Sequence, residues 1–347
     1  MKNREDGRVQ ITDANEYRYW KTLRSIGFAL LLFLLFINLF SLAVSGLSLL
    51  LRYLPIPKVK ANVIYQLFYA AGYLASFMVP VAFLRLFIKK SGYPYQPMRA
   101  QLKLSPWLPL ILFGGIAAIW TLAYLNATMV SIFHYADFSS EVLWSSDDGG
   151  EWYALVLRFI VMCLVPAFCE EFFFRGAILS NCLPFGRGTA IFISALLFGL
   201  MHQNAEQIFY AFGAGLVLGL VYERTESIWN CIFLHLANNF FSTFETNFAN
   251  AFSQRFSGVA IAIFEAVLFG IGIVCVVFLV LRFAPRKQTF RDGIFGKSVP
   301  ADDAYAACPV SAKTAFKRFL NVPMVIFLAL GLAQILLLIV MAVFYYG

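Results

Sequence analysis

Long apolar stretches follow one another along most of this chain and constrain its fold more than any other feature. A helix needs about 20 predominantly apolar residues to cross a bilayer. The stretches are rich in leucine, phenylalanine, isoleucine and alanine, and they lack the alternation of a barrel strand. The nine candidate spans are roughly residues 25–50, 63–88, 106–129, 155–183, 189–204, 206–222, 228–246, 257–282 and 322–346. We therefore predict an all-α, polytopic integral membrane protein with about eight to nine transmembrane helices and a site buried in the helix bundle.

The composition excludes several other classes of protein. Only 13% of the residues are charged, whereas a soluble domain carries about 25%. The net charge of +8 does not indicate a nucleic-acid partner, because the basic residues flank the apolar stretches. The six cysteines are scattered without C-x-x-C spacing and are interpreted as small buried hydrophobic residues. The expected surroundings are a lipid bilayer, and the expected location is the cell membrane.

The distribution of lysine and arginine predicts the orientation. The tail before Ser25 carries six of these residues, 85–103 carries five and 282–321 carries eight. The 130–152 loop carries none and is acidic. With nine spans, the basic segments share one side, and the positive-inside rule places the N-terminus in the cytoplasm. Arg52, Lys58 and Lys60 would then lie on the other side, which is a modest exception.

Ionisable side chains stand inside three of the apolar stretches. Charged groups are costly in hydrocarbon, so such residues indicate a functional site. Glu170 and Glu171 are adjacent, and Arg175 follows Glu171 at i+4 in the favourable acid-before-base order. Neighbouring helical residues point about 100° apart, so the two acids are not expected to face one site directly. We expect Glu171 and Arg175 to pair as structural support and Glu170 to be free for chemistry. A charge cluster at the membrane surface is the alternative.

Two of the three histidines lie downstream in apolar stretches. His202 ends one of them, and His235 and Asn239 share a face of another at i and i+4. A lone histidine at the end of a span is more often interfacial or part of the core, and a polar pair can simply hold helices together. If the groups converge, a glutamate can act as general base, while an imidazole orients water and donors stabilise an oxyanion. Glu170, His202 and His235 are equally the ligand types of catalytic zinc, and the spacing does not choose between these chemistries.

These residues resemble the CPBP family of intramembrane proteases, which includes the type II CAAX prenyl endopeptidases and the bacterial Abi proteins. The family pattern is E-E-x-x-x-R, then F-x-x-x-H, then H-x-x-x-N or D, on successive membrane helices. Here it is carried by Glu170-Glu171-x-x-x-Arg175, by Phe198-x-x-x-His202 and by His235-x-x-x-Asn239. The resemblance implies that Glu170 and His202 activate water and that His235 and Asn239 stabilise the oxyanion. It does not settle metal dependence, although we favour a reaction without a metal or other cofactor.

The expected function is intramembrane cleavage of a membrane-associated or prenylated-type protein or peptide substrate. A non-catalytic relative that binds a membrane peptide, such as an immunity protein, is one alternative, and a proton-coupled transporter is another. Phenylalanines near the acids could line a lipid-accessible groove, although an aromatic membrane surface is the commoner reason for such residues. They are Phe172, Phe173, Phe174 and Phe198.

The chain is expected to fall into four segments. Residues 1–24 form a cytoplasmic polar tail, and 25–150 form the N-terminal transmembrane helices. Residues 151–250 form a catalytic core of the CPBP type. Residues 251–347 form the C-terminal helices, with a basic cytoplasmic loop at 283–321. The first apolar run is longer than the ~7–15 residues of a signal-peptide core, so we expect it to remain as the first span.

Overall fold

A computed structural model describes residues 4–5, 8–9, 13–90, 95–102, 104–132, 152–203, 205–251, 254–283, 299–300 and 310–346. The described chain is predominantly helical, as predicted for an all-α membrane protein. Three two-residue strands add a small antiparallel sheet, namely β1 (Arg4–Glu5), β2 (Arg8–Val9) and β3 (Val299–Pro300). The acidic loop, Cys308 and most of the basic loop at 283–321 lie outside the described residues.

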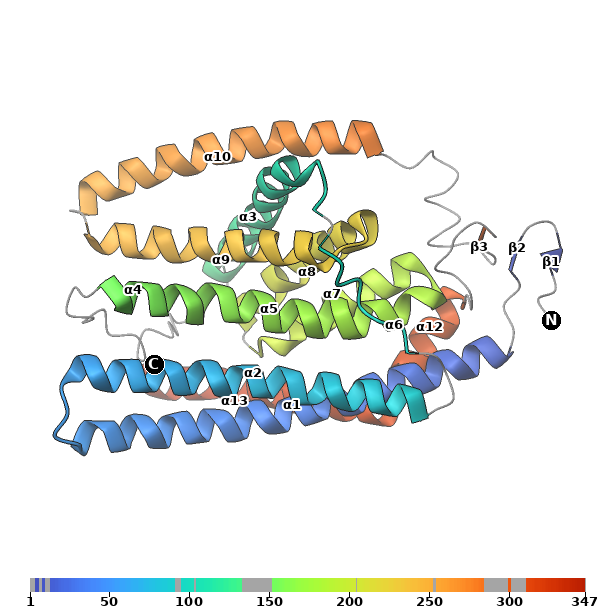
Figure 1. Cartoon of the computed structure of the whole chain (residues 1–347), viewed down its shortest axis with the longest axis horizontal. Coiled ribbons are helices and arrows are strands. Elements are labelled where there is room, and N and C mark those ends of the chain that lie inside the picture. The colour runs from blue at the N-terminus through green and yellow to red at the C-terminus, as the bar shows by residue number, and fades with distance from the viewer. Residues whose placement is uncertain are drawn as a thin grey trace.

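Two groups of long helices flank the centre of the bundle (Figure 1). On one side, α1 (Asp13–Tyr53) packs against α2 (Lys58–Lys90) and α13 (Val322–Tyr346). On the other, α10 (Gln254–Phe283) packs against α3 (Leu108–Ile132). α1 has acidic residues in its first turn and α2 has lysines in its last turn, both of which complement the helix dipole.

The helices α7 (Arg187–Met201), α8 (Ala205–Thr225) and α9 (Ile228–Ala251) fill the centre together with a composite helix. The composite runs from α4 (Trp152–Phe159) through α5 (Val165–Glu171) to α6 (Ser180–Cys182). Two π-helical segments interrupt it, η2 (Ile160–Leu164) and η3 (Phe172–Leu179), and a 3₁₀ turn, η4 (Leu183–Phe185), ends it. Figure 1 shows α5 between α2 and α9, with which it makes contact.

The predicted count of eight to nine transmembrane helices is not confirmed. Each predicted span overlaps a helical segment, but only four helices are long and apolar enough to cross a membrane, within the part of the chain that the structure describes. A fifth is possible if α12 (Ala312–Phe319) and α13, bent by 69°, count as one broken span. The 15 residues of α7 extend only about 22 Å, which is less than the ~30 Å of a hydrocarbon core. By length and composition, the candidate spans among the described residues therefore fall short of eight to nine.

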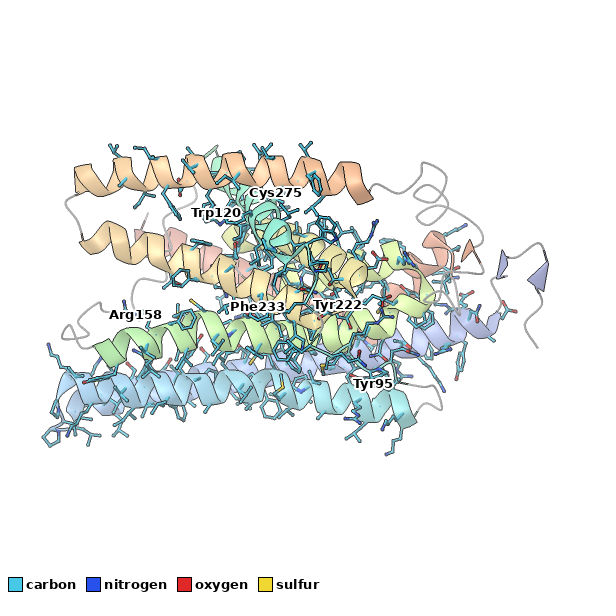
Figure 2. All side chains as sticks on the ribbon, turned by 45° about the horizontal axis from the view of Figure 1, so that its top comes forward. Tyr95, Trp120, Arg158, Tyr222, Phe233 and Cys275 are labelled. Atoms are coloured by element: carbon cyan, nitrogen blue, oxygen red, sulfur yellow. The ribbon has the colours of Figure 1, made fainter. Side chains whose placement is uncertain are left out.

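The described parts of the three basic segments meet at one end of the bundle, here called the α12 end. Arg318 pairs with Glu16 at 2.8 Å, Asn181 Oδ1 accepts a bond from the backbone N–H of Gln96 at 2.9 Å, and Phe185 O accepts one from that of Val310 at 3.2 Å. The turn between α1 and α2 lies at the opposite end (Figure 1). In Figure 2, Arg158 lies toward that opposite end and Tyr95 near the α12 end.

Helices α7 and α8 approach closely through the glycines of a G-x-x-x-G pair on α8. A Cβ atom on Gly215 would lie 2.8 Å from the Cα of Ala195, and one on Gly219 would lie 3.0 Å from the Cγ2 of Ile191. Small residues allow this approach and are typical of helix packing in membranes. The turn that carries His202 is thereby held against the centre of the bundle.

We expect Gly215→Ala to destabilise the protein by about 1–3 kcal/mol, because the added methyl group meets backbone atoms that cannot move aside. The measurement is the thermal unfolding midpoint of purified protein in one detergent. Gly270→Ala is the matched control, since a methyl group added there on α10 would have nothing within 4 Å and helix propensity favours alanine. Equal midpoints for the two variants would contradict the close α7–α8 contact.

Candidate active site

The two acids lie at the end of α5, at the point where the helix widens. Glu170 and Glu171 are both buried, and the π-helical segment η3 begins at the next residue. The Ser180 N–H at its end bonds to the carbonyl of Arg175, five residues earlier. π-Helical turns occur frequently at functional sites. Here the widened turn carries Arg175 beside the acids.

Glu171 and Arg175 form a fully buried ion pair. Arg175 Nη1 donates to Glu171 Oε1 at 2.9 Å, and both side chains are 0% exposed. Arg175 Nη2 also donates to the carbonyl of Gly215 at 3.2 Å, and the guanidinium carbon lies 4.5 Å from the centre of the Phe198 ring. The pair therefore joins α5 and η3 to both α7 and α8.

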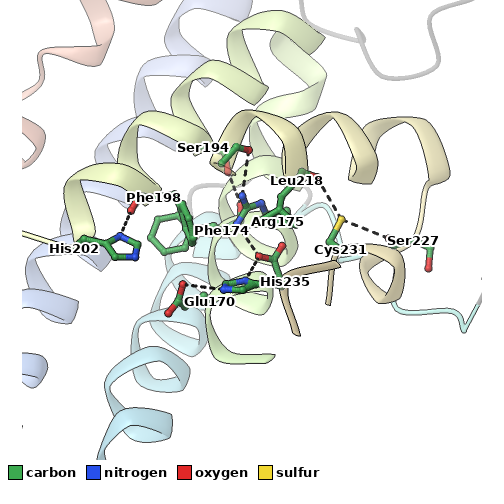
Figure 3. A network of polar contacts seen from close by, with 12 residues as sticks. Glu170, Phe174, Arg175, Ser194, Phe198, His202, Leu218, Ser227, Cys231 and His235 are labelled. Carbon is green, nitrogen blue, oxygen red and sulfur yellow. Dashed lines mark hydrogen bonds and ion pairs between the residues drawn. The ribbon is translucent and has the colours of Figure 1, made fainter. Parts of the chain in front are cut away.

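His235 lies between the two acids. The prediction that Glu170 and Glu171 do not face one site, because neighbouring helical residues point about 100° apart, did not include such a bridge. Its Nδ1–H donates to Glu171 Oε1 at 2.8 Å. Its Nε2, on the opposite edge of the ring, lies 3.8 Å from Glu170 Oε2 (Figure 3). One imidazole can thus meet two carboxylates that point in different directions. With His235 protonated, the two acids and two bases of this cluster carry no net charge.

Glu170 has a second partner that the sequence reasoning missed. The hydroxyl of Tyr73, on α2, donates to Glu170 Oε1 at 2.5 Å. In the sequence, Tyr65, Tyr69 and Tyr73 repeat at i+4 spacing in an apolar stretch. That repeat could have indicated a polar face on α2, but nothing in it places α2 against α5.

His202 is close to the cluster, although no direct contact between His202 and Glu170 is found among the described residues. Its Nδ1–H donates to the Phe198 carbonyl at 2.9 Å. The Phe198 ring meets the rings of His202 and His235 edge-on, with centroid distances of 5.2 and 6.0 Å. Figure 3 shows the Phe198 side chain between His202 and Arg175. The structure thus brings His235, rather than His202, to the carboxylate of Glu170.

Asn239 is half-buried one turn beyond His235. Its Oδ1 accepts a bond from the side chain of Asn238 at 3.4 Å. Asn238 is buried and exchanges hydrogen bonds with the Tyr210 hydroxyl of α8, at 2.9 and 3.2 Å. Asn238 therefore joins α9 to α8, while Asn239 has the more exposed position.

The alternative set of zinc ligands is not assembled in this structure. Among the described residues, no group of three or more His, Cys, Asp or Glu side chains could hold a metal ion. Glu170 and His235 approach each other, but the ring of His202 contacts Phe198 instead. The five described cysteines are buried free thiols.

The phenylalanines beside the acids mainly build the core. Phe173 and Phe174 are 0% exposed and Phe198 is 3% exposed, while Phe172 is partly buried against the same core. Their buried positions do not fit the proposed lipid-accessible groove. The Phe198 ring lies against the Arg175 guanidinium, and apolar surroundings strengthen the electrostatic interactions of the pair.

Comparisons with known proteins agree with the resemblance seen in the motifs. Residues 152–241 match the family described as Type II CAAX prenyl endopeptidase Rce1-like. The protein named "Putative membrane peptidase YdiL" from Bacillus subtilis (strain 168) is 33% identical over 92 residues. That region is 25% of this chain and 36% of the relative, so the chain matches little more than a third of the relative's length. No solved structure gave a significant match. The predicted family resemblance is confirmed for residues 152–241, the segment that contains both acids, both site histidines and Asn239.

We expect Arg175→Ala to destabilise the fold by about 3–5 kcal/mol, because the Glu171 carboxylate would remain buried without its cation. The thermal midpoint and the folded yield in detergent measure this loss. Arg99→Ala is the control, since the Arg99–Glu226 pair is 34% and 50% exposed and such pairs contribute at most about 1 kcal/mol. A normal yield and midpoint for Arg175→Ala would contradict the structural role of the pair.

Proposed function

We propose that this protein is an intramembrane endopeptidase in which Glu170 activates the hydrolytic water. The observation that carries the proposal is the approach of Glu170 Oε2 to His235 Nε2 at 3.8 Å, inside an apolar helix bundle. A water molecule to one side of the line that joins these two atoms can hydrogen-bond to both of them. The Rce1-like match over residues 152–241 supports the same reaction class.

In the proposed reaction, a water molecule binds beside Glu170 Oε2 and His235 Nε2, within hydrogen-bond distance of both. Glu170 takes its proton, and the resulting hydroxide attacks the carbonyl carbon of the peptide bond. Glu170 then returns the proton to the leaving amine, so the carboxylate is unchanged after the cycle. Glu171 accepts the Nδ1–H bond of His235, which fixes the ring and directs Nε2 toward Glu170. In its protonated form, His235 can donate through Nε2 to the developing oxyanion.

Asn239 and His202 complete the proposed site. Asn239 is on the same face of α9 as His235 and is assigned to the oxyanion. His202 is assigned to orienting the water. In this structure its Nδ1–H is bonded to the Phe198 carbonyl, and Nε2, which has no partner among the residues that the structure describes, is assigned that role. No step in this scheme requires a metal. A chelator should therefore leave the activity of purified protein intact, whereas restoration by added zinc alone would require a metal mechanism.

The proposed substrate is a membrane-associated or prenylated-type protein or peptide, because the site lies within the helix bundle. The matched family is described as a prenyl endopeptidase. A prenylated C-terminal peptide is therefore one candidate within the proposed class of substrates.

We expect Glu170→Gln to abolish turnover while the fold survives, because the amide keeps the shape of the side chain but cannot take the proton. Membrane and secreted proteomes are compared between cells that produce the wild type and cells that produce the variant. Glu265→Gln is the control, since Glu265 is an intramembrane acid on α10 that accepts a bond from Tyr124. Substrate cleavage by Glu170→Gln at the wild-type rate would refute the assignment and favour a non-catalytic role.

We further propose that the α12 end faces the cytoplasm, with residues 1–24 as a cytoplasmic tail. α12 is a short basic helix at a 69° bend from α13, with Lys313, Lys317 and the 70%-exposed Phe316 on its outside. A helix of this kind lies in the membrane interface, and the positive-inside rule favours its cytoplasmic placement.

Single cysteines at Lys58 and Lys317 test this orientation, since both positions are exposed at opposite ends of the bundle. We expect a membrane-impermeant maleimide added to intact cells to label Lys58→Cys and to leave Lys317→Cys unlabelled until the cells are opened. Labelling of Lys317→Cys in intact cells would reverse the orientation, and labelling of both would contradict the placement of these positions on opposite sides.

A further inference from the structure

The hydroxyl of Tyr73 selects one oxygen of the Glu170 carboxylate. Tyr73 belongs to α2, outside the segment 152–241 that matches the protease family. Its O–H donates to Glu170 Oε1 at 2.5 Å, within the ~2.5–2.7 Å typical of strong bonds from a hydroxyl to a carboxylate. The other oxygen, Oε2, is left facing His235.

The Tyr73 ring is itself held in a column of aromatic side chains. It stacks on Tyr69 with a centroid distance of 5.9 Å and packs against Phe77 at 4.9 Å. Phe77 is 1% exposed and contacts Phe33 and Phe173, so the column is anchored to α1 and to η3. A donor locked by packing on a rigid helix can hold its partner in a reactive geometry.

This hydrogen bond addresses a specific weakness of a glutamate base. The terminal torsion of a glutamate side chain is broad and roughly two-fold, so the carboxylate can rotate unless a partner holds it. Glu170 has no ion pair with an arginine comparable to that of Glu171 among the described residues. Tyr73 is the donor bound to it, and His235 is the ring that its free oxygen faces.

We propose that Tyr73 is a positioning residue for the catalytic carboxylate, supplied by the N-terminal helices of this chain rather than by the matched core. It holds Oε1, so that Oε2 remains directed at the water that His235 also contacts. This inference rests on the proposed role of Glu170 as general base.

Tyr73→Phe tests the inference, because it removes the hydroxyl and keeps the ring contacts with Tyr69 and Phe77. The probe is an internally quenched peptide that spans a cleavage site mapped by the Glu170→Gln proteome comparison. We expect kcat to fall about 10- to 100-fold, the size of effect that misplacement of a reacting group produces. KM should stay at its wild-type value, since substrate binding does not depend on the hydroxyl. The thermal midpoint should fall, since the buried Glu170 carboxylate loses a hydrogen bond, so kcat is measured well below the midpoint of the variant.

Tyr124→Phe is the matched control, because it deletes the same kind of bond, from a tyrosine hydroxyl to a glutamate, between α3 and α10. Its kcat should equal that of the wild type. Wild-type kcat in Tyr73→Phe, or an equal loss in both variants, would overturn the positioning role. A fall in kcat that disappears once the activity is corrected for the folded fraction of each protein would instead identify Tyr73 as structural. The proposed function has its own test, because activity that survives Glu170→Gln would refute it. A failed prediction for the tyrosine variants would refute only the positioning role of Tyr73.

Discussion

The need to satisfy a carboxylate with no exposure to solvent organises the centre of this protein. Glu171 lies in an apolar bundle, where an unpaired charge would be strongly destabilising. Arg175 and His235 both donate to one of its oxygens, and Arg175 reaches onward to the Gly215 carbonyl. These bonds connect the composite helix with α8 and α9. The close α7–α8 packing then carries the His202 turn along with them.

The structural pair also orients the imidazole beside it. Because Nδ1 of His235 is committed to Glu171, the ring can present only Nε2 to Glu170. Glu170, one residue earlier on the helix, therefore faces an oriented His235 ring, although Arg175 bonds to Glu171. The two adjacent acids have different partners because their side chains point in different directions. One faces the interior of the bundle and the other faces α2.

The motifs predicted much of this arrangement. Helical spacing alone places Glu171 and Arg175 on one helix face, and it does the same for His235 and Asn239. The all-α membrane architecture also followed from the long apolar runs. The number of crossings did not, since an apolar stretch can also form a helix such as α7, whose 15 residues are too short for a hydrocarbon core. The Tyr73–Glu170 bond joins residues 97 positions apart. Its prediction would have required knowing which helices are neighbours. Predicting that His235 bridges the two acids would likewise have required knowing how α9 is rotated relative to α5.

The contribution of α2 changes how the sequence motifs should be interpreted. Glu171 and Arg175 can form the ion pair within the matched segment, because the donors to Glu171 among the described residues come from η3 and α9. The bonded partner of the Glu170 carboxylate comes instead from a helix outside that segment. A chain with the same three motifs and an apolar residue at the place of Tyr73 would keep the buried pair but leave this carboxylate free to rotate. The motifs therefore specify the structural half of the site, and the aromatic column of α2 specifies the direction in which the proposed base faces.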